Sequence, residues 1–267
     1  MPWPIKLILP ALCLVLAAGC ADSETSGGSD DSTDANDGQD GIFGSFLAGE
    51  GKSLLPEREG GRYFTPIRPA TDDRVRRLKT PEGFAVEVWA QDLGPIRMMA
   101  LGPDGAVYVT RPARGDVLAL RDDDGDDKAD RPREAVRLAD VHGIHIQDGR
   151  KMYLATVGEA YVCEFGGGRV SRPRRIVQGM PTAPGHHNRT LAVGPDGRLY
   201  ITVGSTCNCC WEENPENATM LVAEADGSNR RVFARGLRNT IGFGWHPRTK
   251  ELWGMDHGID WLGPDTP

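Results

Sequence analysis

Two adjacent histidines, His186 and His187, lie where a loop leads into a strand, in the stretch APGHHNRTLAVGPDGRLYITVG (183–204). Histidine suits proton abstraction near neutral pH because its unperturbed pKa lies close to 7. We therefore take His186 as the candidate general base, with His187 as the alternative. Arg189 follows closely, and its fork of N–H donors suits an anionic ligand such as a carboxylate.

A second candidate site is the acidic run RDDDGDDKAD, residues 121–130. Its alternating carboxylates resemble the first half of a calcium loop and are Asp122, Asp124 and Asp126. An EF-hand would need glycine at position 127 and a bidentate acid at position 133, where this chain has aspartate and arginine. The run predicts either a weak second calcium site or a solvated acidic turn.

The stretch STCNCCWEENPENAT brings Cys207, Cys209 and Cys210 together. Three local thiols cannot form a four-thiolate zinc site. We expect a disulfide between Cys207 and Cys210 that shapes the loop. A vicinal bridge between Cys209 and Cys210, and free or metal-bound thiols, are the alternatives.

The elements that must position these residues follow from an internal repeat. Similar phrases centre on Tyr108, Tyr153, Tyr200 and Trp253, at spacings of 45, 47 and 53 residues. Each unit contains an alternating apolar strand, an Asp-Gly type turn (degraded to HPRTK in the last unit) and a second strand with an aromatic residue. Four strands in a period of about 45 residues are typical of a β-propeller blade. We predict an all-β fold in which residues 75–267 form about four blades.

Residues just before the first strand of each repeat are the ones that reach the mouth of a propeller channel. These strand entries are GPIRMMA, DVHGIH, APGHHNRT and GLRNTIGFG. Three of them carry arginine and two carry histidine. We expect His142 and His145, which flank Ile144 on an alternating strand, to be structural.

Taken together, APGHHNRTLAVGPDGRLYITVGSTCNCCWEENP, VFARGLRNTIGFGWHP and MDHGIDWLG resemble the glucose/sorbosone dehydrogenase family of soluble quinoproteins. The resemblance extends from about residue 78 to the C-terminus. It implies a six-bladed propeller of which this chain, which we expect to be truncated at its C-terminus, contains about four blades. It also implies pyrroloquinoline quinone (PQQ) and calcium as cofactors.

The same resemblance implies roles for individual residues. His186 matches the base that takes the hydroxyl proton of a sugar while hydride passes to the quinone. Arg238 and Asn239 of GLRN match a quinone-binding pair, and we expect Arg189 to contact the cofactor as well. Gly258 and Ile259 of DHGID fall where two backbone carbonyls would bind calcium.

The N-terminal part of the chain predicts a cell-envelope lipoprotein. Residues 1–20 contain a short apolar run that ends in the lipobox-like LAAGC, which makes Cys20 the lipidation site. A plain secretory signal or a retained anchor is the alternative. Residues 21–45 are expected to be a disordered acidic tether, followed by an irregular entry segment at 46–74. Ala21 after the cysteine favours the outer membrane.

Charge and composition limit the classes of partner. The net charge is −7, and the tether contains seven acidic residues with no lysine or arginine, so the remainder is balanced. No basic face indicates nucleic acid binding. We predict PQQ- and calcium-dependent oxidation of a sugar or sugar aldehyde, a small-molecule substrate, with an electron acceptor that the sequence does not identify. The alternatives are a non-catalytic propeller that binds a carbohydrate or a protein partner, and a calcium-dependent lactonase-like propeller.

Overall fold

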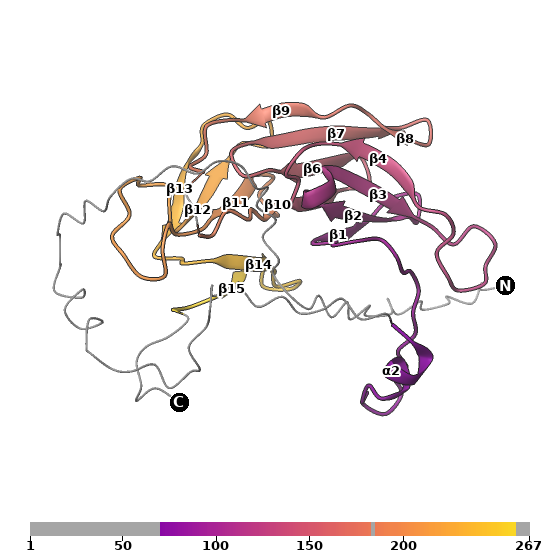
Figure 1. Cartoon of the computed structure of the whole chain (residues 1–267). Coiled ribbons are helices and arrows are strands. Elements are labelled where there is room, and N and C mark those ends of the chain that lie inside the picture. The colour runs from indigo at the N-terminus through magenta and orange to yellow at the C-terminus, as the bar shows by residue number, and fades with distance from the viewer. Residues whose placement is uncertain (1–69, 183–184, 260–267) are drawn as a thin grey trace, which may run out of the picture.

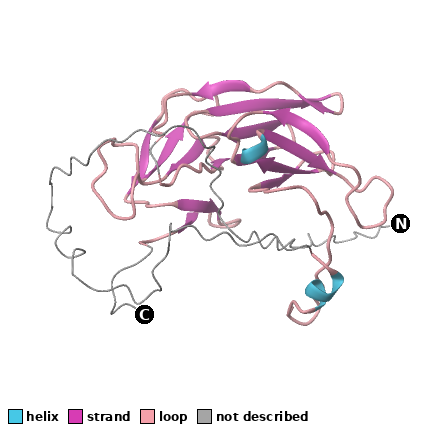
Figure 2. Cartoon of the chain, in the orientation of Figure 1, coloured by secondary structure: helices cyan, strands magenta, loops and turns pink. Residues whose placement is uncertain are grey.

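A computed structural model describes residues 70–182 and 185–259. The predicted signal (1–20), the tether (21–45) and most of the entry segment lie outside these residues. The described part is built almost entirely of antiparallel strands, with one short α-helix, α2 (Asp72–Arg76), standing apart from the sheets (Figures 1 and 2). None of its helices has the length and apolar character needed to cross a bilayer.

Four sheets follow one another along the chain. The first sheet contains β1 (Met99–Leu101), β2 (Val107–Arg111), β3 (Asp116–Leu120) and β4 (Arg133–Arg137), with the 3-10 turn η1 (Pro112–Arg114) between β2 and β3. The second contains β5 (Gly143–Gln147), β6 (Lys151–Ala155), β7 (Ala160–Gly166), β8 (Arg169–Val170) and β9 (Arg174–Val177). The third contains β10 (Leu191–Val193), β11 (Leu199–Val203), β12 (Thr219–Ala223) and β13 (Arg231–Arg235), and the last contains β14 (Thr240–Trp245) and β15 (Leu252–Asp256).

Consecutive sheets pack against one another through their first or second strands. Strand β5 contacts β1 on one side and β10 on the other, and β11 contacts β14. Within each sheet the strands pair with their sequence neighbours, apart from β9, which pairs with β7. Successive meanders packed in chain order are the arrangement of propeller blades. The four repeats read from the sequence correspond to these four sheets.

The core consists of apolar layers between successive sheets. Strand β6 shows how one strand serves two layers, because successive side chains of a strand point to opposite faces. Met152 and Leu154 pack with the first sheet, whereas Tyr153 and Ala155 pack with the third. A further layer joins Tyr200 of β11 to Trp245 of β14. Middle strands such as β11 are consequently buried along their whole length.

The hairpin turns at one end of the sheets repeat a side-chain contact. The Tyr108 hydroxyl donates to Asp104 Oδ2 at 3.2 Å, and the Tyr200 hydroxyl donates to Asp196 Oδ2 at 2.9 Å. In both GPDG turns the aspartate also accepts a backbone N–H two residues further along the chain. The repeated phrase of the sequence is therefore a repeated turn, at the end of the sheet opposite to the strand entries.

Candidate functional site

Three segments meet at the strand-entry end of the third and fourth sheets. They are the entry to β10 (186–190), the start of the β11–β12 connection (204–210) and the entry to β14 (237–239). Ser205 joins all three, because its backbone N–H donates to Arg238 O at 2.8 Å and its own oxygens contact His186. Two residues that lie 52 positions apart, the candidate base and the candidate quinone-binding arginine, thus contact the same serine.

The contacts of His186 fix its tautomer. Its Nδ1 lies 3.0 Å from Ser205 O and 2.9 Å from Ser205 Oγ. A carbonyl oxygen can only accept, so Nδ1 carries the proton. The Ser205 hydroxyl donates to Cys207 O at 2.6 Å, so its oxygen can also accept from Nδ1. In the neutral ring, Nε2 then has an available lone pair, which is the state that a general base requires.

This contact depends on two glycines that let the segments approach. A Cβ at Gly204 would lie 2.4 Å from the Cβ of His186 and 2.7 Å from its carbonyl oxygen. A Cβ at Gly185 would lie 2.8 Å from Thr206 O, and its φ of +98° is unfavourable for other residues. Both sequence positions therefore require glycine for steric reasons.

Arg238 is held by acceptors from two segments. Its Nε donates to Asn208 O at 2.8 Å and its Nη2 to Asn208 Oδ1 at 2.7 Å. Its Nη1 donates to His257 O at 3.1 Å, just after β15. These acceptors fix the plane of a guanidinium group that is suited to pair with an anionic ligand.

Asp256 organises the GLRN turn from the end of β15. Its carboxylate accepts the backbone N–H groups of Arg238 at 3.2 Å and Asn239 at 2.9 Å, and the Thr240 hydroxyl at 2.7 Å. The backbone of Asn239 is thereby fixed between β14 and β15, since its oxygen also accepts the N–H of His257. The predicted pair, Arg238 and Asn239, is thus part of one bonded turn.

Arg189 does not agree with the predicted cofactor contact. The residue is only 1% exposed, and its guanidinium donates to four backbone carbonyls, those of Pro181, His186, Val157 and Asn188. Burial lowers the pKa of Arg189 to about 10. Because the group is enclosed by protein oxygens, its role is to hold the backbone of the His186 segment in place.

His142 connects three sheets at the same end of the molecule. Its backbone oxygen accepts the Thr110 hydroxyl at 2.8 Å, its N–H donates to Ala155 O, and its Nδ1 lies 2.9 Å from Arg189 O. Burial is the main cause that lowers the pKa of His142 to about 4, with further lowering by the charges of Arg97 and His187. These contacts agree with the structural role expected for His142.

His145 is removed from this group. It is half-buried on β5, and its ring lies beside that of Tyr153 with a centroid distance of 6.5 Å. Burial lowers its pKa. The charge of Arg97 also lowers the pKa of His142, so the entry to β1 brings an arginine close to the entry to β5. This end of the molecule consequently suits an anionic ligand.

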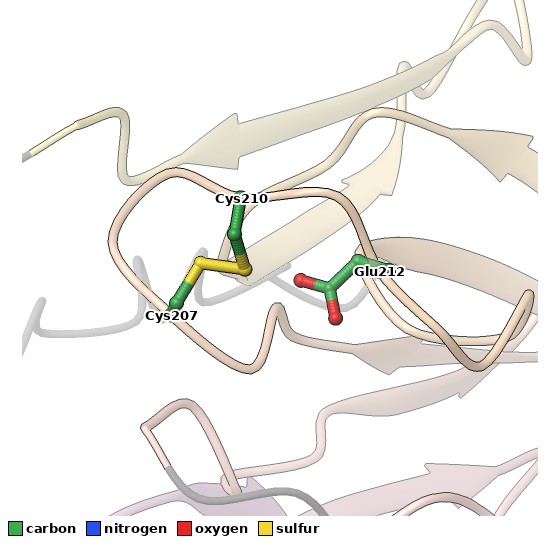
Figure 3. Close-up of side chains that lie close together, drawn as sticks. All are labelled: Cys207, Cys210 and Glu212. Carbon is green, nitrogen blue, oxygen red and sulfur yellow. A yellow bond between two sulfur atoms is a disulfide. The ribbon is translucent and has the colours of Figure 1, made fainter. Parts of the chain in front are cut away.

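The cysteine-rich loop is closed as favoured from the sequence. Cys207 and Cys210 form a disulfide, while Cys209 is free and exposed. Glu212 lies beside the bridge (Figure 3), and its Oε1 accepts the Thr206 N–H at 2.8 Å. The pairing leaves neither Cys207 nor Cys210 as a thiolate ligand in this structure.

The acidic loop brings together a set of carboxylates different from the predicted one. Oxygens of Asp122, Asp124 and Asp130 lie within 4.8 Å of one another, so Asp130 takes the place predicted for Asp126. Asp126 instead accepts the Lys128 N–H at 2.9 Å. The Asp122 carboxylate closes the loop by accepting two backbone N–H groups, those of Gly125 and Asp127.

Gly258 and Ile259, the residues predicted to bind calcium through their carbonyls, follow β15 and are exposed. They come directly after His257, whose oxygen accepts from Arg238. The structure thus places this segment beside the Arg238 turn, far in the sequence from the acidic loop.

Sequence reasoning missed three residues of the site: Ser205, Asn208 and Asp256. Asp256 is the last residue of β15, in the quoted MDHGID phrase, but its hydrogen bonds to the GLRN turn depend on the pairing of β14 with β15. The position of Asn208 between two cysteines was the one signal that could have drawn attention to it. Ser205 has no distinguishing sequence signal.

The described residues define a class: an all-β protein whose consecutive sheets pack as propeller blades and whose strand entries carry a histidine and an arginine. The chain belongs to the TrAA12-like family, whose model matches residues 78–265. This membership and the structural neighbours below confirm the predicted quinoprotein propeller fold and the predicted resemblance.

The chain has the fold of solved quinoprotein domains. It is similar to the PQQ domain of pyranose dehydrogenase from Coprinopsis cinerea, with a TM-score of 0.60, 21% identity, and coverage of 68% of this chain and 48% of that one. For the PQQ-bound aldose sugar dehydrogenase from Streptomyces coelicolor the TM-score is 0.52, the identity 17%, and the coverage 65% of this chain and 60% of that one.

An uncharacterised protein of Borreliella burgdorferi is 23% identical over 222 residues, which cover 76% of this chain and 55% of that protein. The chain spans about half the length of this relative and of the pyranose dehydrogenase domain.

Proposed function

We propose that this chain is part of a dehydrogenase that oxidises a sugar or a sugar aldehyde with PQQ and calcium. Membership of the TrAA12-like family and the similarity to PQQ-containing dehydrogenases support an oxidoreductase of this kind. The observation that carries the proposal is the contact between His186 Nδ1 and Ser205 O, which assigns the ring N–H to Nδ1 and directs Nε2 away from Ser205. We further propose that Cys20 anchors the protein by lipid to the cell envelope.

The chemistry of the strand-entry residues fits the cofactors. PQQ is a tricarboxylate, and the cationic side chain of Arg97 lies close enough to His142 to lower its pKa at this end of the molecule. Arg238, held in a fixed plane by Asn208 and His257, would pair with an anionic group of the quinone. The carbonyls of Gly258 and Ile259 are oxygen ligands of the kind that calcium prefers.

The residues of this chain would act as follows. His186 Nε2 accepts the proton of the substrate hydroxyl, and the Nδ1–H bond to Ser205 O stabilises the imidazolium that forms. Bound PQQ supplies an electrophilic carbonyl that accepts hydride. Arg238 donates hydrogen bonds to the negative charge that develops beside it. Arg189 keeps the His186 segment in place without touching the reacting atoms.

The test uses the full protein with added PQQ and calcium chloride, with dye reduction followed over a panel of aldoses. His186→Asn keeps an N–H group near the position of Nδ1 and lacks the Nε2 acceptor. We expect its kcat to fall by about 10²–10⁴-fold, the usual contribution of a general base. PQQ affinity, titrated by difference absorbance, should stay within twofold.

Two further histidine variants make the result specific. His187→Asn examines the alternative base, and a loss of kcat in this variant alone would transfer the role to His187. His246→Asn is the matched control, because His246 lies in the β14–β15 turn, where its Nδ1 accepts the Thr249 N–H. If the wild-type protein neither binds PQQ nor reduces the dye, the proposed reaction is wrong, and a non-catalytic binding role is favoured.

A further inference from the structure

Residues 205–210, which we call the cystine loop, contact both side chains to which the proposed function gives chemical roles. Its first residue contacts His186, and its middle residue contacts Arg238. We propose that the cystine loop is the positioning element of the site: it sets the tautomer of His186 and the plane of Arg238 together, and the Cys207–Cys210 disulfide maintains this coupling. The inference rests on the proposed function for its effect on catalysis.

The histidine side of the coupling passes through Ser205. This residue is buried, and both of its oxygens lie within hydrogen-bond distance of His186 Nδ1, at 2.9 and 3.0 Å. Its hydroxyl proton is donated onward to Cys207 O at 2.6 Å. Because this hydroxyl proton is directed to Cys207 O, Ser205 Oγ faces His186 as an acceptor. A half-cystine of the disulfide thus supplies the oxygen that orients the serine.

The arginine side passes through Asn208, the next residue in the loop. Both its backbone oxygen and its side-chain Oδ1 accept from Arg238, at 2.8 and 2.7 Å. Two parallel acceptors on one residue define an orientation as well as a distance. Arg238 O, in turn, accepts the Ser205 N–H at 2.8 Å, so the loop and the GLRN turn bond in both directions.

The disulfide matters because the loop has no strand or helix of its own. Residues 204–218, between β11 and β12, form neither a strand nor a helix. The bridge closes a ring of few residues around Asn208 and restricts the conformations that the carbonyls of Cys207 and Asn208 can adopt. Both carbonyls are the acceptors described above, so opening the ring would release the two contacts at once.

The first experiment opens the ring and reads both side chains without turnover. Cys207→Ala/Cys210→Ala removes the bridge, and Cys209→Ala is the matched control because Cys209 is free, exposed and in the same loop. In the ligand-free full protein, imidazole ¹⁵N shifts report the His186 tautomer, and hydrogen exchange reports the protection of Arg238 Nε–H. We expect the double variant to lose the single tautomer and at least tenfold of the exchange protection, whereas the control keeps both.

The second experiment separates the two sides with single substitutions that leave the disulfide in place. Asn208→Ala removes the Oδ1 acceptor, and we expect about tenfold weaker PQQ binding with an unchanged His186 tautomer. Asn208→Asp restores an acceptor for Arg238 Nη2 and should keep the exchange protection of Arg238 Nε–H in the ligand-free protein within about twofold of wild type. Ser205→Ala removes the Oγ contact and keeps the backbone oxygen that accepts from His186 Nδ1, so the tautomer should persist while the imidazole ¹⁵Nδ1 resonance and the pH profile of kcat change, with PQQ affinity unaltered.

The outcomes distinguish this inference from the proposed function. A folded double cysteine variant with wild-type tautomer and wild-type exchange would overturn the positioning role, whatever the activity. If that variant does not fold, equal PQQ affinities for Asn208→Ala and wild type, together with an unchanged ¹⁵Nδ1 resonance of His186 in Ser205→Ala, overturn it instead. Failure of wild type to bind PQQ contradicts the proposed function, while the two ligand-free measurements still decide whether the loop positions His186 and Arg238.

Discussion

The loops at the two ends of the third sheet differ in the segments with which they form hydrogen bonds. At the hairpin-turn end, Asp196 bonds to Tyr200 of the same hairpin, and the first sheet repeats this contact with Asp104 and Tyr108. At the strand-entry end, Ser205 bonds to segments before β10 and before β14. At the hairpin-turn end, the first and third sheets close their hairpins with local contacts, whereas the strand-entry end joins several sheets and holds the candidate site.

The corresponding connections of two sheets show the same contrast. The β2–β3 connection of the first sheet is short and is closed by a bidentate pair in which Arg111 donates to Asp116 at 2.8 and 2.6 Å. The β11–β12 connection of the third sheet is longer, is closed by a disulfide and directs Asn208 toward Arg238. Both connections are closed, so closure alone does not distinguish them. The β11–β12 connection contributes to the site because it is longer and forms hydrogen bonds to another segment.

The largest effect is expected for Arg189 at the strand-entry end. Arg189→Met leaves four backbone carbonyls without their donor in a buried position. A buried acceptor left without its donor costs about 1–3 kcal/mol, so the loss of several at once should destabilise by at least about 3 kcal/mol. Urea unfolding should show this loss of free energy, whereas Arg198→Met, in an exposed hairpin turn, should change it by less than about 0.5 kcal/mol. A loss below 1 kcal/mol at Arg189 would contradict the structural role of this residue.

The second effect concerns His142 and depends on pH. Because the pKa is about 4 in the folded state and about 6.5 in the unfolded state, the unfolded chain binds the proton first as pH falls. The stability associated with neutral His142 is complete above pH 6.5 and decreases progressively toward pH 4. The shift corresponds to about 3 kcal/mol.

The matched variant for this measurement is His142→Asn, which keeps an N–H group directed at Arg189 O and removes the titration. Its free energy of unfolding should fall less than that of wild type between pH 7 and pH 4.5, by about 2 kcal/mol. Equal pH dependences of the two proteins would show that His142 does not titrate in a buried position. Both proteins contain the same carboxylates, so subtracting one pH dependence from the other removes the carboxylate contribution.

The hairpin-turn end was readable from the sequence because its contacts are local. Asp196 and Tyr200 are four positions apart, so the phrase that predicts the turn also contains the bonded pair. The strand-entry end was only partly readable. The sequence indicated His186 and Arg238, but Asn208 reaches Arg238 across 30 positions, and no local pattern encodes such a contact.

Arg189 shows why a residue type alone misleads at this end. An arginine near a channel mouth suits an anionic ligand, which led to the predicted cofactor contact. Carbonyl oxygens from residues as distant in sequence as Val157 accept the hydrogen bonds of its guanidinium group. The correction to the acidic loop has a related cause, because the backbone turn places Asp130 rather than Asp126 beside Asp122.

The smallest effect is expected at the hairpin-turn end, where the three repeat tyrosines can be compared directly. Tyr200→Phe and Tyr108→Phe each remove one hydrogen bond to an aspartate and should cost about 1 kcal/mol of unfolding free energy. Tyr153 occupies the same repeat position, but its buried hydroxyl has no hydrogen-bond partner among the described residues. Tyr153→Phe should therefore be neutral or stabilising, because it removes an unsatisfied polar group. No loss at Tyr108 and Tyr200 would mean that the aspartate contacts contribute nothing, and that the aromatic ring alone accounts for the repeat.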